Sequence, residues 1–376
     1  MKSTRWAVLI LCFLLAVPAR AAEPRSAVLM DAATGTILYE SNAHDALAPA
    51  SVTKVMTLLL IMEAIDSGRI GWEDTVTASE AAAAKGGSQV YLKIGETMTV
   101  SDMVKSIAVS SANDCACAMA EHLAGSEGAF VELMNNRAAE LGMNDTHFVN
   151  CTGLDDDPAA KKHRTSAHDI AVMSRELLVN HPDIKNYTTI WMDTIRDGAF
   201  GLSNTNKMVR YYPGCTGLKT GFTSGAGYCL SASALRDGME LIAVVMGAET
   251  SQERFAACKG LLDQGFANYT LYQPALQEGA SVPVKLGQAD SVAAVPEQAP
   301  QLLVEKARQR SLTTEISLVP SVDAPVKAGQ VLGALTVRAG EEILAEVPLV
   351  AENEVPRLTW GQVTARVLRQ VAMAGG

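Results

Sequence analysis

Apolar and polar positions divide the chain into a mixed region followed by a β-prone region. Residues 26–40 hold two β-prone runs around a turn that contains glycine, which predicts a hairpin. Apolar residues at helical spacing then predict a helix over residues 51–68, with Ser51 as its N-cap and Gly68 as its end. Residues 76–147 are rich in alanine and helical in pattern, with a polar break around residues 86–88.

Strand-like patterns return after one more helix. Residues 165–178 predict a capped helix, and residues 225–234 and 240–249 predict adjacent antiparallel strands. Residues 251–269 predict a closing helix. Two strands, a series of helices, three strands and a last helix indicate a mixed α/β (α+β) fold with a central antiparallel sheet and a helical lobe.

The pattern changes near residue 274. Residues 275–352 consist of short β-prone runs separated by glycine and proline, which predicts a small all-β sandwich. The last segment, residues 356–376, predicts an amphipathic helix. Its apolar face holds Trp360, Val363, Val367, Leu368 and Val371, and its polar face holds Gln362, Arg366 and Arg369. Such a helix is too short to span a bilayer, so we expect peripheral membrane contact; packing on the β domain is the alternative.

The N-terminus has the features of a secretory signal peptide. Lys2 and Arg5 precede an apolar run over residues 6–17, and small residues follow Pro18. We expect residues 1–21 to be removed near Ala21 and the mature protein to act outside the cytoplasm. A membrane anchor is the alternative, although the run is short for a spanning helix.

Composition excludes some classes of protein. The net charge of −10 argues against a nucleic-acid binder, which would need a basic face. Six cysteines follow the signal peptide, and we expect most of them to be small buried residues whose pairing the sequence leaves open. They are Cys115, Cys117, Cys151, Cys215, Cys229 and Cys258. The histidines form no metal-binding set; His163 and His168, five apart, are expected on the surface near a helix start.

Three short motifs suggest nucleophilic catalysis. Ser51 and Lys54 form S-x-x-K, residues 111–113 read S-A-N, and residues 219–221 read K-T-G. This ordered set occurs in penicillin-binding proteins and β-lactamases. A serine at a helix N-terminus is placed where backbone N–H groups favour negative charge, and Lys54 lies one turn further on the same face.

Lys54 could act as a base only if its pKa is lowered. Burial in an apolar helix and a second cation, for which Lys219 is the candidate, would do this. The surrounding run 216–228 resembles a glycine-rich strand edge. Gly221 there would leave room for a substrate backbone, so that an extended peptide could add to the edge.

The chain resembles the low-molecular-mass penicillin-binding proteins that are serine-type D-alanyl-D-alanine carboxypeptidases. The segments "APASVTKVMT", "SSAND", "YYPGCTGLKTGFTSGAGY" and "VVMGAET" show this, together with the β-rich C-terminal region and the terminal helix. The resemblance implies a penicillin-binding/β-lactamase-like catalytic domain over residues 22–274 and a β-rich domain over 275–353. It implies peptidoglycan stem peptides and β-lactams as partners, and neither a cofactor nor a metal.

The resemblance also assigns roles to residues. It implies that Ser51 is acylated, that Lys54 is its base, and that Ser111 relays protons. It further implies substrate contacts, with backbone N–H groups of Ser51 and Phe222 as the oxyanion hole; the contact residues are Asn113, Lys219, Thr220, Gly221, Phe222 and Arg254. Two residues depart from the family pattern. Cys115 stands where a small residue is more usual, and Phe222 stands where some members have a histidine.

Two alternatives differ in function. A class A β-lactamase shares the three motifs but needs a glutamate that activates water, and Glu132 and Asn135 form a local E-x-x-N. The pair lies closer to Ser111 than that family places it. A non-catalytic peptidoglycan-binding envelope protein would keep the fold, but the intact motifs argue against it.

Overall fold

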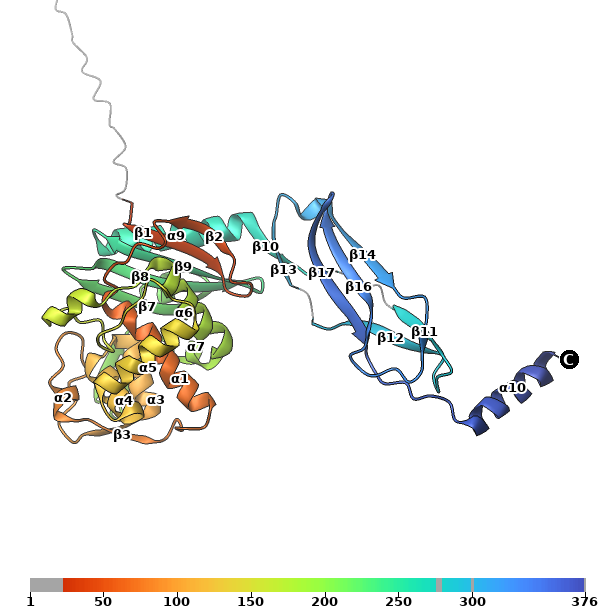
Figure 1. The fold of residues 1–376 in the computed structure, drawn as a ribbon. Helices are drawn as coiled ribbons and strands as arrows, with labels where there is room; N and C mark the ends of the chain where they lie inside the picture. The colour runs from red at the N-terminus through yellow and green to blue at the C-terminus, as the bar shows by residue number, and fades with distance from the viewer. Residues whose placement is uncertain (1–22, 275–278, 299–300, 375–376) are drawn as a thin grey trace, which may run out of the picture.

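The computed structural model describes residues 23–274, 279–298 and 301–374. The expected signal peptide, residues 1–21, lies outside the described residues. For residue 367 and residues 369–374, only the backbone is described. Figure 1 shows an elongated molecule: a sheet with helices on both sides at one end, a β-rich region beside it, and a terminal helix at the far end.

A five-stranded antiparallel sheet forms the centre of the first region, as the sequence predicts. The strand order is β2-β1-β9-β8-β7, so β7 lies at one edge. The strands are β1 Ser26–Asp31, β2 Ile37–Ser41, β7 Cys215–Thr223, β8 Gly227–Arg236 and β9 Met239–Ala248. The edge position leaves one side of β7 without a neighbouring strand.

Helices cover both faces of this sheet (Figure 1). Helix α9 (Ser251–Asn268) covers one face, where it packs on Leu241 and Val245. The helical lobe covers the other face, where Ile242 and Val244 enter the larger core. The alternation of neighbouring residues between two cores follows from the two-residue period of a strand. The lobe contains α1 Lys54–Asp66, α3 Val100–Ser110, α4 Asn113–Ala124, α5 Glu127–Glu140 and α6 Ala167–Asn180.

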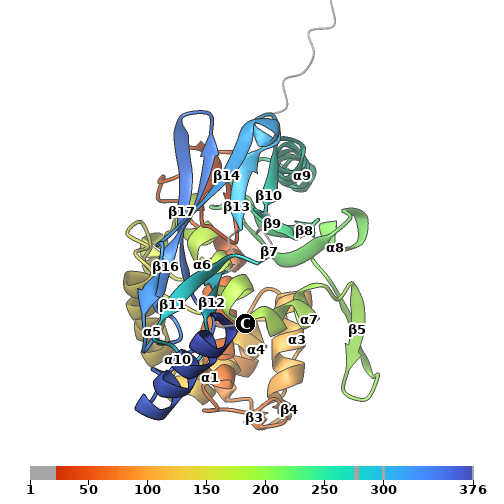
Figure 2. The same ribbon diagram turned by 90° about the vertical axis from the view of Figure 1, so that its right-hand side faces the viewer.

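Several short elements were not predicted: the hairpin β5–β6 (Met192–Ile195, Phe200–Ser203) and the helices α7 Lys185–Thr188 and α8 Met208–Tyr211. Helix α2 (Glu80–Ala83) lies within the range predicted to be helical. That prediction is wrong at the hairpin β3–β4 (Thr75–Thr77, Thr97–Thr99). The β5–β6 hairpin projects from the body in Figure 2. The predicted break at 86–88 extends over residues 84–96, because the Asp114 carboxylate accepts hydrogen bonds from the backbone of Val90 and Leu92.

The predicted N-cap role of Ser51 is wrong. Helix α1 begins at Lys54, and Ser51 lies in a 3₁₀ turn, η1 (Ala50–Thr53), that precedes it. The Thr53 hydroxyl donates to the Ala50 carbonyl at 2.8 Å and closes this turn. The hydroxyl of Ser51 is therefore not used as a cap. By contrast, Ser166 caps α6 as predicted by accepting from the Asp169 N–H.

The C-terminal region is all-β up to its last helix, as predicted. Its six-stranded sheet has the order β14-β16-β17-β12-β11-β15 around a core of Val282, Leu335, Val337 and Leu349. These strands are β11 Ser281–Lys285, β12 Ser291–Pro296, β14 Leu312–Leu318, β15 Val322–Asp323, β16 Val331–Ala339 and β17 Glu342–Ala351. Strand β10 (Tyr269–Tyr272) pairs with β13 (Leu302–Glu305), which links the two regions across residue 274.

The predicted terminal helix is present as α10 (Trp360–Ala374). Thr359 and Gln362 cap it reciprocally, and the Arg366 guanidinium forms an ion pair with Asp290. Trp360 is 88% exposed and Leu368 is also exposed. Within the described residues, no helix combines the length and apolar content needed to cross a membrane.

Candidate active site

The first motif brings Ser51 and Lys54 into contact. Lys54 Nζ lies 3.0 Å from Ser51 Oγ, because the turn η1 and the first turn of α1 place both side chains on one side. Ser51 is half-buried, whereas Lys54 has no exposed surface. The hydroxyl is therefore accessible to a substrate, while its partner amine is shielded from water.

Burial lowers the pKa of Lys54 to about 7. Desolvation is the main cause, since removing water from an ammonium group favours the neutral amine. No carboxylate in the described part of the chain forms an ion pair with Lys54; Asp114 opposes the shift only from a distance. A substantial fraction of Lys54 is therefore neutral near pH 7 and can accept a proton from Ser51.

Lys219 lies on the edge strand β7, is buried, and donates to the Thr220 carbonyl at 3.0 Å. Its pKa is lowered well below the ordinary value, first by burial and then by the charges of Lys54 and Arg254. The expected second cation is thus close to Lys54. Burial is the main cause of the lowered pKa of both lysines, and repulsion between the two like charges adds to it.

The second motif supplies two buried polar atoms without partners among the described residues. Ser111 ends α3 in a left-handed conformation (φ 62°), and its Oγ has no hydrogen bond. Asn113 donates from Nδ2 to the Gly86 carbonyl at 2.7 Å, while its Oδ1 has no partner. Buried polar atoms are normally paired, so these two are candidates to bind a substrate.

The third motif lies directly against the nucleophile. A Cβ atom added to Gly221 would lie 2.7 Å from the Pro49 carbonyl oxygen and 3.0 Å from the backbone nitrogen of Ser51. The close approach that this glycine allows is therefore that of the turn holding Ser51. Room for a substrate backbone at Gly221 stays a prediction. Thr220 Oγ1 bonds Thr205 Oγ1 at 2.7 Å.

Phe222 and Arg254 both contact the ring of Tyr228. Phe222 is 53% exposed and stacks on the Tyr228 ring at 4.2 Å, while the Arg254 guanidinium lies 5.3 Å from the centre of that ring. Arg254 is only 7% exposed and donates to the carbonyl oxygens of Gly221 and Cys229. Its Nε has no partner among the described residues. Arg254 therefore supports β7 from within.

The sequence interpretation missed Thr152, whose backbone carbonyl accepts from Lys54 Nζ at 2.8 Å. Asn150 holds this carbonyl's peptide in place: its Oδ1 accepts from the backbone N–H groups of Thr152 and Gly153. The run Asn150–Leu154 reads N-C-T-G-L, and asparagine is common in turns because its side chain can bond the backbone two residues on. Nothing in that pattern indicates a contact with Lys54.

Other candidate residues lie elsewhere or have another role. His163 is buried, against the prediction of a surface position, and its Nε2 lies 2.8 Å from Thr53 Oγ1; burial lowers its pKa to about 4. Glu132 is exposed on α5, and Asn135 binds the backbone of Phe148. The E-x-x-N pair of the β-lactamase alternative is therefore not arranged as a catalytic unit.

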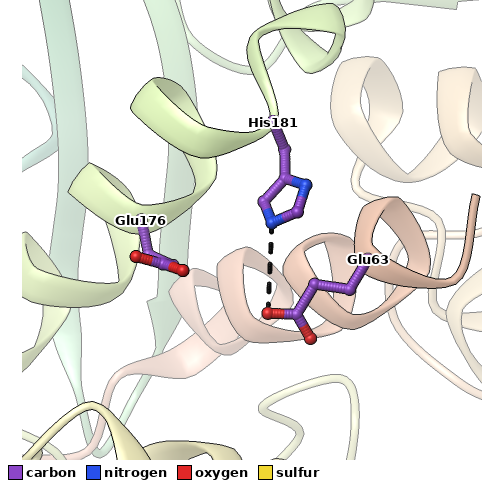
Figure 3. Close-up of side chains that lie close together, drawn as sticks. All are labelled: Glu63, Glu176 and His181. Atoms are coloured by element: carbon purple, nitrogen blue, oxygen red, sulfur yellow. Dashed lines mark ion pairs between the residues drawn. The ribbon is translucent and has the colours of Figure 1, made fainter. Parts of the chain in front are cut away.

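Among the described residues, one group of side chains has metal-ligand chemistry: Glu63 on α1, and Glu176 and His181 near the end of α6 (Figure 3). The Arg137 guanidinium already binds both carboxylates, at 2.7 Å to each. An arginine in this position satisfies the carboxylates and would repel a cation. The group is therefore an ion-pair network that joins α1, α5 and α6.

Sequence comparisons match both regions. The family described as "D-alanyl-D-alanine carboxypeptidase" matches residues 15–250, and "Penicillin-binding protein 5, C-terminal domain" matches residues 267–357. The D-alanyl-D-alanine carboxypeptidase DacF of Bacillus subtilis is 43% identical over 342 residues, which cover 89% of this chain and 86% of that protein. DacD of Escherichia coli is 35% identical, with 87% and 86% covered.

Solved structures give the same result. Penicillin binding protein 5 from Haemophilus influenzae has a TM-score of 0.74 and 30% identity, with 89% of this chain and 98% of that chain covered. Penicillin-Binding Protein D2 from Listeria monocytogenes, in an ampicillin-bound form, has a TM-score of 0.59 and 33% identity, with 65% and 97% covered. Most of the chain thus shares its fold with solved proteins.

Proposed function

The chain belongs to the D-alanyl-D-alanine carboxypeptidase family, and we propose that Ser51 is the nucleophile of this reaction and Lys54 its base. It is a serine-type carboxypeptidase and a low-molecular-mass penicillin-binding protein with a function in the cell wall. The observation that supports the assignment best is the 3.0 Å contact between Ser51 Oγ and a buried Lys54 amine without a carboxylate partner.

The reaction we propose is acyl transfer. Neutral Lys54 takes the proton of Ser51, and Ser51 Oγ attacks the carbonyl carbon of the penultimate D-alanine of a peptidoglycan stem pentapeptide. The backbone N–H groups of Ser51 and Phe222 stabilise the oxyanion, each by a factor of roughly 10²–10³. The bond to the terminal D-alanine breaks, and Ser111 delivers the proton to the leaving amine. Water then hydrolyses the acyl-serine, and penicillins acylate Ser51 in the same way.

We assign substrate binding to groups around the free edge of β7. Asn113 has an unpaired amide oxygen that can accept from the substrate amide. Lys219 and Thr220 supply the charge and hydroxyl that suit the terminal carboxylate, with Gly221 keeping the strand against the turn of Ser51. Phe222 offers an exposed ring beside them. Arg254 contributes through its support of the Gly221 carbonyl and its positive charge.

We further propose the domain boundaries of the protein and its location in the cell. Residues 1–21 act as a signal peptide, 22–274 form the catalytic domain and 275–353 the β-rich domain. Residues 356–376 contact the outer face of the cytoplasmic membrane peripherally. The exposed Trp360 and Leu368 support membrane contact, since exposed apolar side chains on an amphipathic helix favour the interface. Deletion of residues 356–376 should then release the protein from membranes without loss of peptidase activity.

Release of D-alanine from a stem pentapeptide tests the activity, and labelling with a fluorescent penicillin tests the nucleophile. We expect both from the wild-type protein and neither from Ser51→Ala. Labelling without D-alanine release, combined with fast penicillin turnover, would favour a β-lactamase instead. Absence of labelling in the folded wild-type protein would favour a non-catalytic envelope protein.

A further inference from the structure

A short loop, residues 150–154, contacts Lys54 and the turn η1 that holds Ser51. Its Thr152 carbonyl accepts from Lys54 Nζ at 2.8 Å. Gly153 lies so close to the turn η1 that an added Cβ atom would be 1.8 Å from the Ala50 carbonyl oxygen. Any displacement of this loop would therefore change the surroundings of Lys54 and of the turn that holds Ser51.

The Thr152 carbonyl restricts the orientation of the Lys54 amine. A neutral amine has two N–H bonds and one lone pair, whereas a carbonyl oxygen only accepts hydrogen bonds. When one N–H bond points to the Thr152 oxygen, the second N–H bond and the lone pair occupy the other tetrahedral positions of the nitrogen. One of these positions faces Ser51 Oγ, which lies 3.0 Å from Nζ. Proton transfer needs the lone pair in that direction, so fixing the carbonyl favours the reactive arrangement.

The side chain of Asn150 fixes this carbonyl's peptide. Oδ1 accepts from the Gly153 N–H at 2.7 Å, from the Thr152 N–H at 3.2 Å and from the Thr152 hydroxyl at 3.3 Å. Nδ2 donates to the Leu154 carbonyl at 2.9 Å and closes the loop. The Asn150 amide thus binds four groups of the residues that follow it. Two of these groups are the N–H groups of Thr152 and Gly153, which lie on either side of the Thr152 carbonyl.

The other contacts of the loop act on Cys151. The Thr57 hydroxyl donates to the Cys151 carbonyl at 2.7 Å, and the Cys151 N–H donates to Glu127 at 3.2 Å. These two contacts anchor the loop on α1 and α5. They do not involve the Thr152–Gly153 peptide, which Asn150 binds. Different residues therefore anchor the loop and orient the Thr152 carbonyl.

We propose that Asn150 is a positioning residue for acylation: its amide holds the Thr152 carbonyl where it orients the Lys54 amine toward Ser51. The proposal rests on the proposed function of Ser51 and Lys54. It adds a residue outside the three motifs, and Asn150 itself touches neither catalytic side chain in the contacts described.

The first test compares Asn150→Ala with Asn135→Ala. Asn135 is a matched control, because its amide also makes three contacts with backbone groups nearby, to Val131 and Phe148, but none with residues 150–154. We expect Asn150→Ala to slow acylation by fluorescent penicillin about tenfold to a hundredfold, the order expected for a small misplacement of a reacting group. Asn135→Ala should change the rate less than about threefold. Thermal unfolding shows whether each variant is folded.

The second test uses Asn150→Asp, which keeps Oδ1 as an acceptor and adds a negative charge. The other ionisable groups around Lys54 are Lys219 on β7, Asp114 on α4 and the Cys151 thiol. An added carboxylate close to Lys54 favours its ammonium form. We expect the midpoint of the acylation rate against pH to move up by about one unit, with the plateau rate reached again at high pH.

The outcomes are distinguishable. Loss of labelling in the wild-type protein would overturn the proposed function and not only this inference. If the wild type is labelled and folded Asn150→Ala reacts at the same rate, Asn150 has no positioning role. Equal slowing in Asn135→Ala would show a general effect on loop stability, and an unchanged midpoint in Asn150→Asp would show that Asn150 does not act on Lys54.

Discussion

Two lysines are connected to the 150–154 loop, Lys54 directly and Lys85 through Glu127, and they differ in charge environment. Lys54 contacts the Thr152 carbonyl, while Lys85 pairs with Glu127, which in turn accepts from the Cys151 N–H. Burial lowers the pKa of Lys54 to about 7. Burial also lowers the pKa of Lys85, but the hydrogen bond and charge of Glu127 outweigh it and raise that pKa overall.

Two differences separate these lysines. Lys54 has no exposed surface, whereas the Lys85 side chain is 24% exposed. Among the described residues, Lys54 also has no paired carboxylate, and its partners are a carbonyl and a hydroxyl. A carboxylate stabilises the ammonium form, whereas a neutral acceptor in a dry site does not compensate for desolvation. Lys85 therefore supports the loop as a permanent cation, and Lys54 can exchange a proton at neutral pH.

The largest expected effect comes from removing each lysine in turn. Lys54→Ala should slow acylation by fluorescent penicillin about 10²–10⁴-fold, the usual contribution of a positioned base. Lys85→Ala, the matched control, should slow it less than about tenfold, which corresponds to about 1.4 kcal/mol. Similar losses in both folded variants would contradict the distinction between the two lysines.

The pH dependence of acylation should follow Lys54. The base must be neutral, so the rate should be constant well above pH 7 and fall about tenfold for each unit below it, to about a hundredfold less at pH 5. Stopped-flow or quenched labelling between pH 5 and 9 measures this. A flat profile over that range would show that Lys54 does not act as the base.

Glu127→Gln should affect stability more than chemistry. Burial raises the pKa of Glu127, but Lys85 and Cys151 lower it overall, so its charge stabilises the fold above pH 4.5 and the effect is lost as pH falls through the folded pKa. We expect a loss of about 1–3 kcal/mol in the free energy of unfolding at pH 7. Urea denaturation should show a smaller difference near pH 3; a constant difference would contradict the charge effect.

Cys151→Ala should have the smallest effect on the reaction. A hydrogen bond with Cys117, burial and nearby Glu127 raise the pKa of Cys151 well above its ordinary value, so the thiol is neutral at pH 7. Only its thiolate form would raise the pKa of Lys54. The acylation rate should change less than about threefold, or about 0.7 kcal/mol. A shift in the pH midpoint of this variant would show that the thiolate form matters after all.

Much of the fold follows from local patterns. The hairpin 26–40, the strands after residue 215 and helices α6 and α9 arise where alternation, helical spacing and capping residues agree. The hairpins β3–β4 and β5–β6 were missed because each strand has only three or four residues, too few for a period to emerge. The start of α1 was misplaced because Ser51 is a good capping residue by type, yet the chain forms a 3₁₀ turn there.

The sequence by itself determined the residue types and order of the three motifs, because S-x-x-K on one helical turn already brings Ser51 and Lys54 together. Only the tertiary structure decided what acts on them. The contact of Lys54 with Thr152 and the approach of Gly221 to the turn of Ser51 join segments about 100 to 170 residues apart in the chain. The hold of Asn150 on Thr152 is local, and it reaches Lys54 only through that long-range contact. The physical reason is that desolvation and orientation depend on every group packed around a side chain, and no local pattern encodes these neighbours.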